Sequence, residues 1–243
     1  MIVVYKKIEG IVVSEFTYEE NSKIIKIFTK EKIISVIAQG AKKIKSPFFS
    51  TTNKFTYGIY NIVYKDNGLS KLVDADILND FRNIKKDIVR VSYATYITEL
   101  TLQVYKHEES SNIYDLYMAS MNKINEGYDP LVISNILKLK LLDNLGIKPV
   151  IDRCVVCGST SNIASVSSYL GGFVCKNCLN NEPLVDIKTI SLIRGLYYVD
   201  INKISKLDIT DKIKKEIDTF INDYYDRYSG IYLKSKSILD NIK

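Results

Sequence analysis

The first third of the chain alternates apolar and polar residues at the two-residue period of β-strands. Five β-branched stretches are separated by short polar turns, and they lie at residues 8–14, 24–29, 32–38, 55–64 and 69–77. Five short strands in such a short region are typical of a small closed barrel. The OB-fold is the common nucleic-acid-binding form of this barrel, and an SH3-like barrel would show nearly the same pattern.

From about residue 84 the apolar positions follow a helical period instead. The third predicted helix begins after Asp129, has Pro130 in its first turn and ends before Gly146. Its apolar residues wrap most of the way round, which predicts a place at the centre of a bundle. The other helices are predicted around residues 93–104, 110–127, 190–197 and 213–228.

All four cysteines lie in one segment that interrupts the helices. They form two Cys-x-x-Cys pairs, Cys154 with Cys157 and Cys175 with Cys178, and Gly158 follows the first pair. This spacing is typical of a structural zinc site, where four thiolates surround one ion and leave no open position for a catalytic water. Two disulfides or four unrelated buried thiols are the alternatives. Between the pairs, residues 163–174 predict a small hairpin.

Composition changes the picture only in part. The chain has 243 residues, is 46% hydrophobic and 26% charged, and carries a formal net charge of +6. No apolar run is long enough for a membrane span, and no signal peptide pattern precedes the barrel, so we expect a cytoplasmic protein without disulfides. The one histidine, His107, is expected at a solvated helix end. No Gly-rich phosphate loop or paired carboxylate motif supports catalysis.

A basic stretch follows the third predicted strand. Lys42, Lys43 and Lys45 lie between Gly40 and Pro47, and an exposed loop of this kind would bind phosphates without sequence preference. Nearby aromatic residues could stack on bases. Alternatively, the lysines only solvate a turn and the aromatic side chains fill the barrel. The aromatic residues concerned are Phe48, Phe49, Phe55, Tyr57 and Tyr60.

The order of these features resembles the bacterial recombination mediator family RecO over nearly the whole chain. The resemblance is carried by Gly10–Val13, Ala38–Ser46, Tyr93–Leu100, Leu141–Gly158 and Leu233–Ser235. Two departures stand out. Lys32 follows Glu31 directly where a glycine turn is usual, and Ile44 stands where proline or a polar residue is more common.

The resemblance implies an α+β, multidomain protein. It places a five-stranded OB-fold barrel at residues 1–79, followed by an all-α domain at 80–243 into which a four-cysteine zinc module, residues 151–186, is inserted. It also implies binding to single- and double-stranded DNA, annealing of complementary strands, and joint action with RecR. In this family such action helps RecA to replace single-stranded DNA-binding protein (SSB), whose C-terminal tail the family contacts.

The leading hypothesis is therefore a non-enzymatic, nucleoid-associated DNA repair mediator with one structural zinc ion. Lys42, Lys43 and Lys45 would hold phosphates, and Lys23 and Lys26 would extend this path along the barrel. The alternative is a zinc-stabilised protein–protein adaptor whose barrel does not bind nucleic acid. A nuclease or nucleotidyl enzyme with unrecognised carboxylates is a third, weaker alternative.

Overall fold

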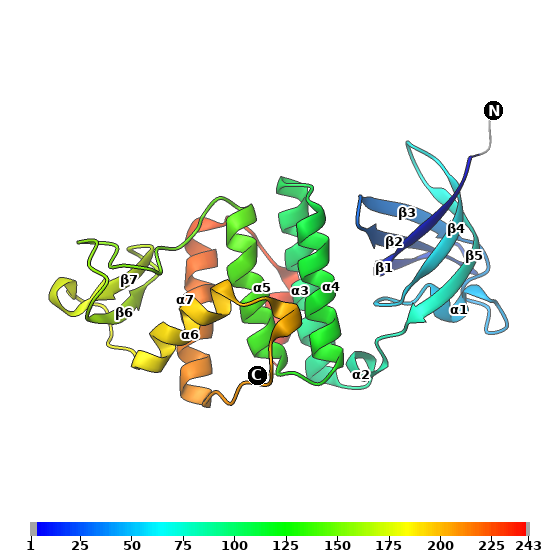
Figure 1. Ribbon diagram of the computed structural model, residues 1–243. Helices are drawn as coiled ribbons and strands as arrows, with labels where there is room; N and C mark the ends of the chain where they lie inside the picture. The colour runs from blue at the N-terminus through cyan, green and yellow to red at the C-terminus, as the bar shows by residue number, and fades with distance from the viewer. Residues whose placement is uncertain (1–3, 242–243) are drawn as a thin grey trace. The chain divides into compact units, whose positions relative to one another are not determined.

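The computed structural model describes residues 4–241 (Figure 1). Ile2 and Val3, where the predicted strand region begins, lie outside the described residues. Contacts divide the chain into two compact units. The barrel unit contains the chain up to residue 86 and also 109–115, and the helical unit contains 87–108 and the chain from 116 onward.

Five strands close the barrel in the order β1-β2-β3-β5-β4. This order, with a parallel pairing of β3 and β5, is the OB arrangement, so the predicted fold class is confirmed. Compared with the ranges predicted from the sequence, β1 and β2 are longer, β5 ends two residues later, and β3 and β4 begin one and two residues later. Their bounds are β1 (Val4–Tyr18), β2 (Ser22–Thr29), β3 (Ile33–Ala38), β4 (Tyr57–Tyr64) and β5 (Ser70–Asn79).

Inward-facing β-branched residues fill the barrel. Ile25, Ile27, Val36 and Ile62 are fully buried in this core, as their alternation with polar neighbours predicts. Tyr60 is also fully buried there, and its hydroxyl donates to backbone oxygens at the short helix α1 (Phe48–Thr51) and just after it. Of the five aromatic residues considered for base stacking, Tyr60 lies in the barrel core, Phe48 packs against it, and Phe55 is buried.

A side chain closes the turn between β2 and β3, where glycine is usual in the family that the sequence resembles. The Thr29 hydroxyl donates to the Lys32 carbonyl at 2.7 Å and accepts from the backbone N–H groups of Glu31 and Lys32. The Thr29 N–H also donates to the Lys32 carbonyl. Because these bonds hold the turn, neither of its central residues needs the left-handed backbone that favours glycine.

The helical unit is a bundle around α5 (Pro130–Asn144). The Asp129 carboxylate accepts from the N–H groups of Leu131 and Val132, which confirms the predicted cap, and nearly every residue of α5 from Val132 to Leu142 is buried. The other helices of this unit are α3 (Ile88–His107), α6 (Ile187–Tyr198), α7 (Asp211–Tyr228) and α8 (Lys234–Asp240), together with α4 (Ser111–Asn125), whose first residues belong to the barrel unit. A single turn, α2 (Arg82–Lys85), precedes them.

A buried ion pair joins α5 to α7. The Lys138 ammonium donates to Asp218 at 2.9 Å and to the Asn222 side-chain oxygen at 3.0 Å, and the two charged side chains are only 2% and 13% exposed. The Tyr225 hydroxyl also donates to the Lys138 carbonyl. A lysine in the middle of an apolar helix therefore fixes the register of two packed helices, since each buried polar atom needs its partner.

Two of the segments that resemble the RecO family meet in this unit. The Glu99 carboxylate, on α3, accepts from the N–H groups of Lys234 and Ser235 and from the Ser235 hydroxyl. Burial opposes the charge on Glu99, but these bonds hold the pKa of its carboxyl below the usual value. The segment Leu233–Ser235 is thus the start of α8, and its N–H groups are bonded by Glu99 of α3. Within residues 4–241, no helix is both long and apolar enough to cross a membrane.

Candidate nucleic-acid interface and metal centre

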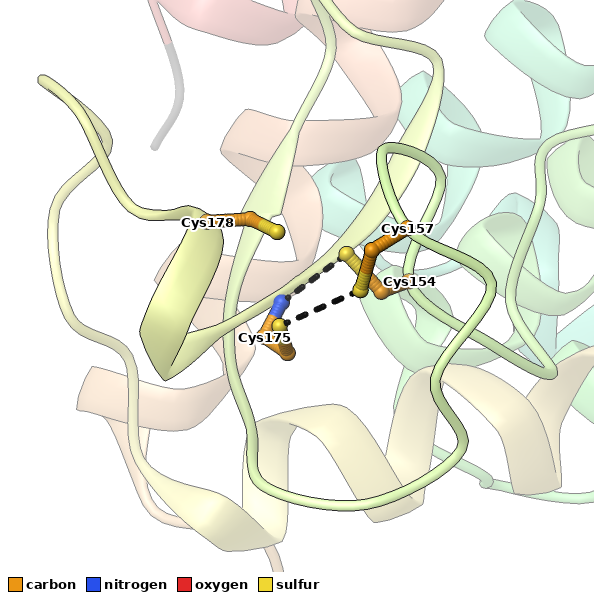
Figure 2. A group of neighbouring side chains, drawn as sticks. All are labelled: Cys154, Cys157, Cys175 and Cys178. Carbon is orange, nitrogen blue, oxygen red and sulfur yellow. Dashed lines mark hydrogen bonds between the residues drawn. The ribbon is translucent and has the colours of Figure 1, made fainter.

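The four cysteines come together at one end of the helical unit (Figure 2). Cys154 and Cys157 lie on one loop, Cys175 ends β7 (Gly172–Cys175), and Cys178 ends the 3-10 turn η1 (Lys176–Cys178). Their Sγ atoms all lie within 4.8 Å of one another. The two Cys-x-x-Cys pairs thus face each other across a small space, as their spacing predicted.

The sulfur positions fit a tetrahedral metal ion. Zn–S bonds of about 2.3 Å require S–S separations of about 3.8 Å around a tetrahedron. The Cys157 and Cys175 Sγ atoms are 3.7 Å apart, and the Cys175 N–H points at the Cys154 Sγ from 3.3 Å. Disulfides are absent from the described residues, in which all four cysteines are free. The donor set is therefore positioned to hold a metal ion.

Local electrostatics supports the same conclusion. Burial opposes ionisation of Cys154, but N–H groups of Cys175, Cys157 and Val156 lower the pKa of its thiol to about 6. Hydrogen bonds with the Cys157 and Cys175 thiols raise the pKa of Cys178 to about 12. Four thiolates at this spacing repel one another, so the last thiols ionise at neutral pH only beside a cation that neutralises them.

Glycines allow the close backbone approaches that build this module. Gly158 has φ +75°, a left-handed conformation, and its N–H closes the first knuckle on the Cys154 carbonyl at 2.9 Å. Gly172 lies against Val150, so that a Cβ there would come within 2.1 Å of the Val150 oxygen. The hairpin of β6 (Ile163–Ser167) and β7 is thereby pinned to the preceding chain.

The basic loop after β3, residues 40–46, has a fixed shape. Ala41 is fully buried in the barrel core, Gly40 has φ +71°, and the Lys42 N–H donates to the Asn21 carbonyl at 3.0 Å. Two further turns follow, from the Lys43 N–H to Gly40 and from the Ser46 N–H to Lys43. Lys42, Lys43 and Lys45 are all exposed, as the sequence predicted.

The two β2 lysines of the predicted phosphate path lie in different places. The Lys23 ammonium contacts Glu15 at 2.6 Å and the Asn53 side-chain oxygen at 3.0 Å, and its side chain is 16% exposed. Lys26 is exposed on the opposite face of β2, because three residues along a strand reverse the direction of the side chain. Lys26 therefore points outward, whereas Lys23 is engaged by a carboxylate at the barrel end.

A β-bulge in β1 brings an aromatic residue, Phe16, to the outer face of the barrel. The sequence did not predict this. The register of β1 shifts between Val12 and Ser14, so that Val12 faces inward while Phe16, of the same parity, faces outward and is 56% exposed. Phe16 pairs with Ile24, and Ile24 with Ile37. The strand predicted at 8–14 stopped before this residue, and a bulge leaves no periodic signal.

The outer row of Phe16, Ile24 and Ile37 continues to a further cation, Lys71, which pairs with Ile37 and is exposed. Lys26 lies in the next row of the same face, opposite Ser14 and Ser35. We call Phe16, Ile24 and Ile37 the apolar row, and residues 40–46 the basic loop. Phe16 is exposed and Ile24 and Ile37 are half-buried, so the barrel joins a partly exposed apolar surface to cations, a combination suited to single-stranded nucleic acids.

Comparison with known proteins decides the family. The family model described as recombination protein O N terminal matches residues 1–81, and the model described as recombination protein O C terminal matches residues 85–237. The chain belongs to the RecO family. Both halves of the resemblance inferred from the sequence are therefore confirmed.

Named RecO relatives are similar along their whole length. The DNA repair protein RecO of Halalkalibacterium halodurans is 34% identical over 98% of this chain and 96% of its own. That of Listeria monocytogenes is 34% identical over 96% and 93%, and that of Bacillus pumilus 33% over 98% and 94%. The match therefore covers both the barrel and the helical unit of this chain.

Proposed function

We propose that this RecO chain binds DNA through the outer face of its barrel and acts as a mediator of recombinational repair without catalysing a reaction. The observation that carries the proposal is the apolar row beside the basic loop within one compact unit. Bases stack on exposed apolar and aromatic side chains, while lysines neutralise the phosphates. The name of the relatives, DNA repair protein, supports the same role.

Lys42, Lys43 and Lys45 hold phosphates at the loop, and Lys26 and Lys71 continue the path beside the apolar row. Lys23 joins this path only when its ion pair with Glu15 opens, so we expect it to contribute less. Binding of this kind releases counterions and is independent of sequence. It also lowers the repulsion between two strands, which favours annealing of complementary DNA.

The metal at Cys154, Cys157, Cys175 and Cys178 is, in this proposal, one structural zinc ion. Bound there, zinc supplies a cross-link and no reactive position, because four sulfurs complete its coordination. The cysteines hold β6, β7 and the Cys154 loop together. The module then supports the helical unit, and the barrel binds the DNA.

The resemblance to the RecO family supports a set of partners. We propose that the chain works with RecR in the cytoplasm, at the nucleoid, and contacts the C-terminal tail of SSB so that RecA can load on single-stranded DNA. The domain bounds in this proposal are residues 1–79 and 80–243, with 151–186 as the inserted module, whereas the barrel unit of the structure reaches residue 86 and includes 109–115. Strand annealing on SSB-coated DNA, with and without RecR, measures this part of the proposal.

The barrel site is tested by Lys42→Ala, Lys43→Ala and Lys45→Ala in one protein. Three lost phosphate contacts reduce the salt slope of single-strand binding by about 2, at about 0.7 per contact, and weaken binding most at low salt. Fluorescence anisotropy with a labelled oligonucleotide at several salt concentrations gives both values. Circular dichroism verifies the fold.

The matched control replaces three exposed lysines of the helical unit, Lys188, Lys203 and Lys206, with alanine. It removes the same net charge from the protein, so it separates local contacts from the general field. An unchanged slope in the loop variant would place the DNA site elsewhere. No salt-dependent binding by the unaltered protein would favour the adaptor alternative.

A further inference from the structure

Ile44 is an exposed apolar side chain at the tip of the basic loop. It is 85% exposed, while its neighbours Lys43 and Lys45 are exposed cations. Single exposed apolar residues are common on protein surfaces and by themselves indicate nothing. Here the surroundings make the difference, because the loop that carries Ile44 is anchored and charged.

The loop holds Ile44 in a defined position. Buried Ala41 anchors the start of the loop, and the Ser46 N–H donates to the Lys43 carbonyl at 2.9 Å, so residues 43–46 form a closed turn around Ile44. Isoleucine is branched at Cβ and has few rotamers. The barrel therefore presents a stiff apolar group, and its ordering on binding costs little entropy.

The charges beside Ile44 determine which ligand its side chain can contact. Consecutive Cα atoms are about 3.8 Å apart, so a strand whose phosphates contact Lys43 and Lys45 passes the loop tip that carries Ile44. The apolar surfaces of a nucleic acid are the faces of its bases. An apolar side chain between cations is suited to an unstacked base, as wedge residues in other nucleic-acid-binding proteins are.

We propose that Ile44 contacts nucleobases of single-stranded DNA and inserts beside or between them, while the neighbouring lysines hold the phosphates. This rests on the proposed function and deepens it, because it names the part of the DNA that the loop tip reads. The loop thus favours strands whose bases are already unstacked. It discriminates against a phosphate backbone that carries no bases.

The experiment pairs a protein change with a DNA change. The full-length protein and its Ile44→Ser variant are titrated with a labelled single-stranded oligonucleotide and with an abasic strand of equal length. We expect the variant to bind the base-bearing strand roughly three- to tenfold more weakly, from lost apolar contact. We expect equal affinities for the abasic strand and an unchanged salt slope, since no charge is lost.

Two controls make the result specific. Ile187→Ser, at an equally apolar residue that is exposed in the helical unit, should bind both strands as tightly as the unaltered protein. Ile44→Leu keeps the apolar volume and should retain the preference for the base-bearing strand.

Failure of this inference is distinct from failure of the proposed function. Equal affinity of Ile44→Ser and the unaltered protein for the base-bearing strand would overturn the base contact. An equal loss on the abasic strand would also overturn it, because the contact would then be with the backbone. If the unaltered protein bound neither strand in a salt-dependent way, the proposed function would fail as well.

Discussion

The barrel and the cysteine module are both small β structures, but they are held together differently. The barrel closes five strands around its own buried core, in which Ile25, Ile27 and Ile62 are fully buried. The module has two strands, Ile163–Ser167 and Gly172–Cys175, with a few buried residues such as Phe173. Two strands of this length cannot stabilise themselves by burial alone.

The difference indicates how each region is stabilised. A barrel with its own core can leave apolar groups, such as Phe16 and Ile44, on its surface for binding. The module uses its four thiols to make up for the core it lacks, and metal binding to such a site contributes on the order of 10 kcal/mol or more to folding. In the proposed function the module supports the helical unit, and the barrel, which carries the basic loop, contacts DNA.

The largest effect is expected when the metal is lost, which should destabilise the cysteine module and leave the barrel unchanged. Cys175→Ser, or a strong chelator, removes a ligand or the ion, and the module loses stabilisation on the order of 10 kcal/mol. Amides of Ile163–Ser167 and Gly172–Cys175 should then exchange hydrogen rapidly, while amides of the barrel strands keep their protection. Metal content is measured on the same samples.

Thr160→Ala is the control for the module, because Thr160 is exposed in the same segment and is not a ligand. It should keep both the metal and the exchange protection. Loss of protection in the barrel of the Cys175→Ser protein would show that the two regions do not fold independently.

A smaller effect is expected from the ion pair inside the helical unit. Lys138→Ala leaves the Asp218 carboxylate buried without its cation, and we expect a loss of about 3–5 kcal/mol of unfolding free energy. Lys212→Ala removes an exposed partner of Glu216 in the same unit and should cost under about 1 kcal/mol. Denaturant titration measures both. Affinity of either folded protein for single-stranded DNA should stay unchanged, and a loss in Lys138→Ala would tie DNA binding to the bundle.

The smallest effect concerns the barrel's own acidic residues. Glu19 and Glu20 are exposed in the β1–β2 turn, whose Asn21 bonds to the basic loop. Replacing both with Gln should tighten single-strand binding roughly two- to threefold at low salt and have no effect at high salt, because only screened repulsion is removed. The control replaces Asp208 and Asp223 of the helical unit with Asn. Equal tightening in both proteins would mean that net charge, and not the loop, sets the affinity.

Much of this comparison could be predicted from the sequence. The alternation of β-branched residues predicted the barrel, Asp129 and Gly146 marked the ends of the central helix, and the cysteine spacing predicted that four thiols converge. Each of these signals is local, since a strand period, a helix cap and a Cys-x-x-Cys turn are determined by a few neighbouring residues.

Long-range partners could not be predicted in this way. The bulge that turns Phe16 outward depends on the pairing of β1 with β2, and the engagement of Lys23 depends on Glu15 across that pair. The sequence left open whether Phe55 and Tyr60 are exposed or buried; both are buried, and for Tyr60 closure of the barrel decides which face of β4 is inside. Lys138 likewise gave no sign of its ion pair with Asp218, 80 residues away.

The most direct test of the assignment is hydrogen exchange of the unaltered protein with and without saturating single-stranded DNA. DNA should slow exchange of the amides of residues 40–46 and of the strands that carry Phe16, Ile24 and Ile37. Exchange in residues 151–186 should be unchanged. Slower exchange in the cysteine module, with none in the basic loop, would contradict the division into a binding barrel and a supporting module.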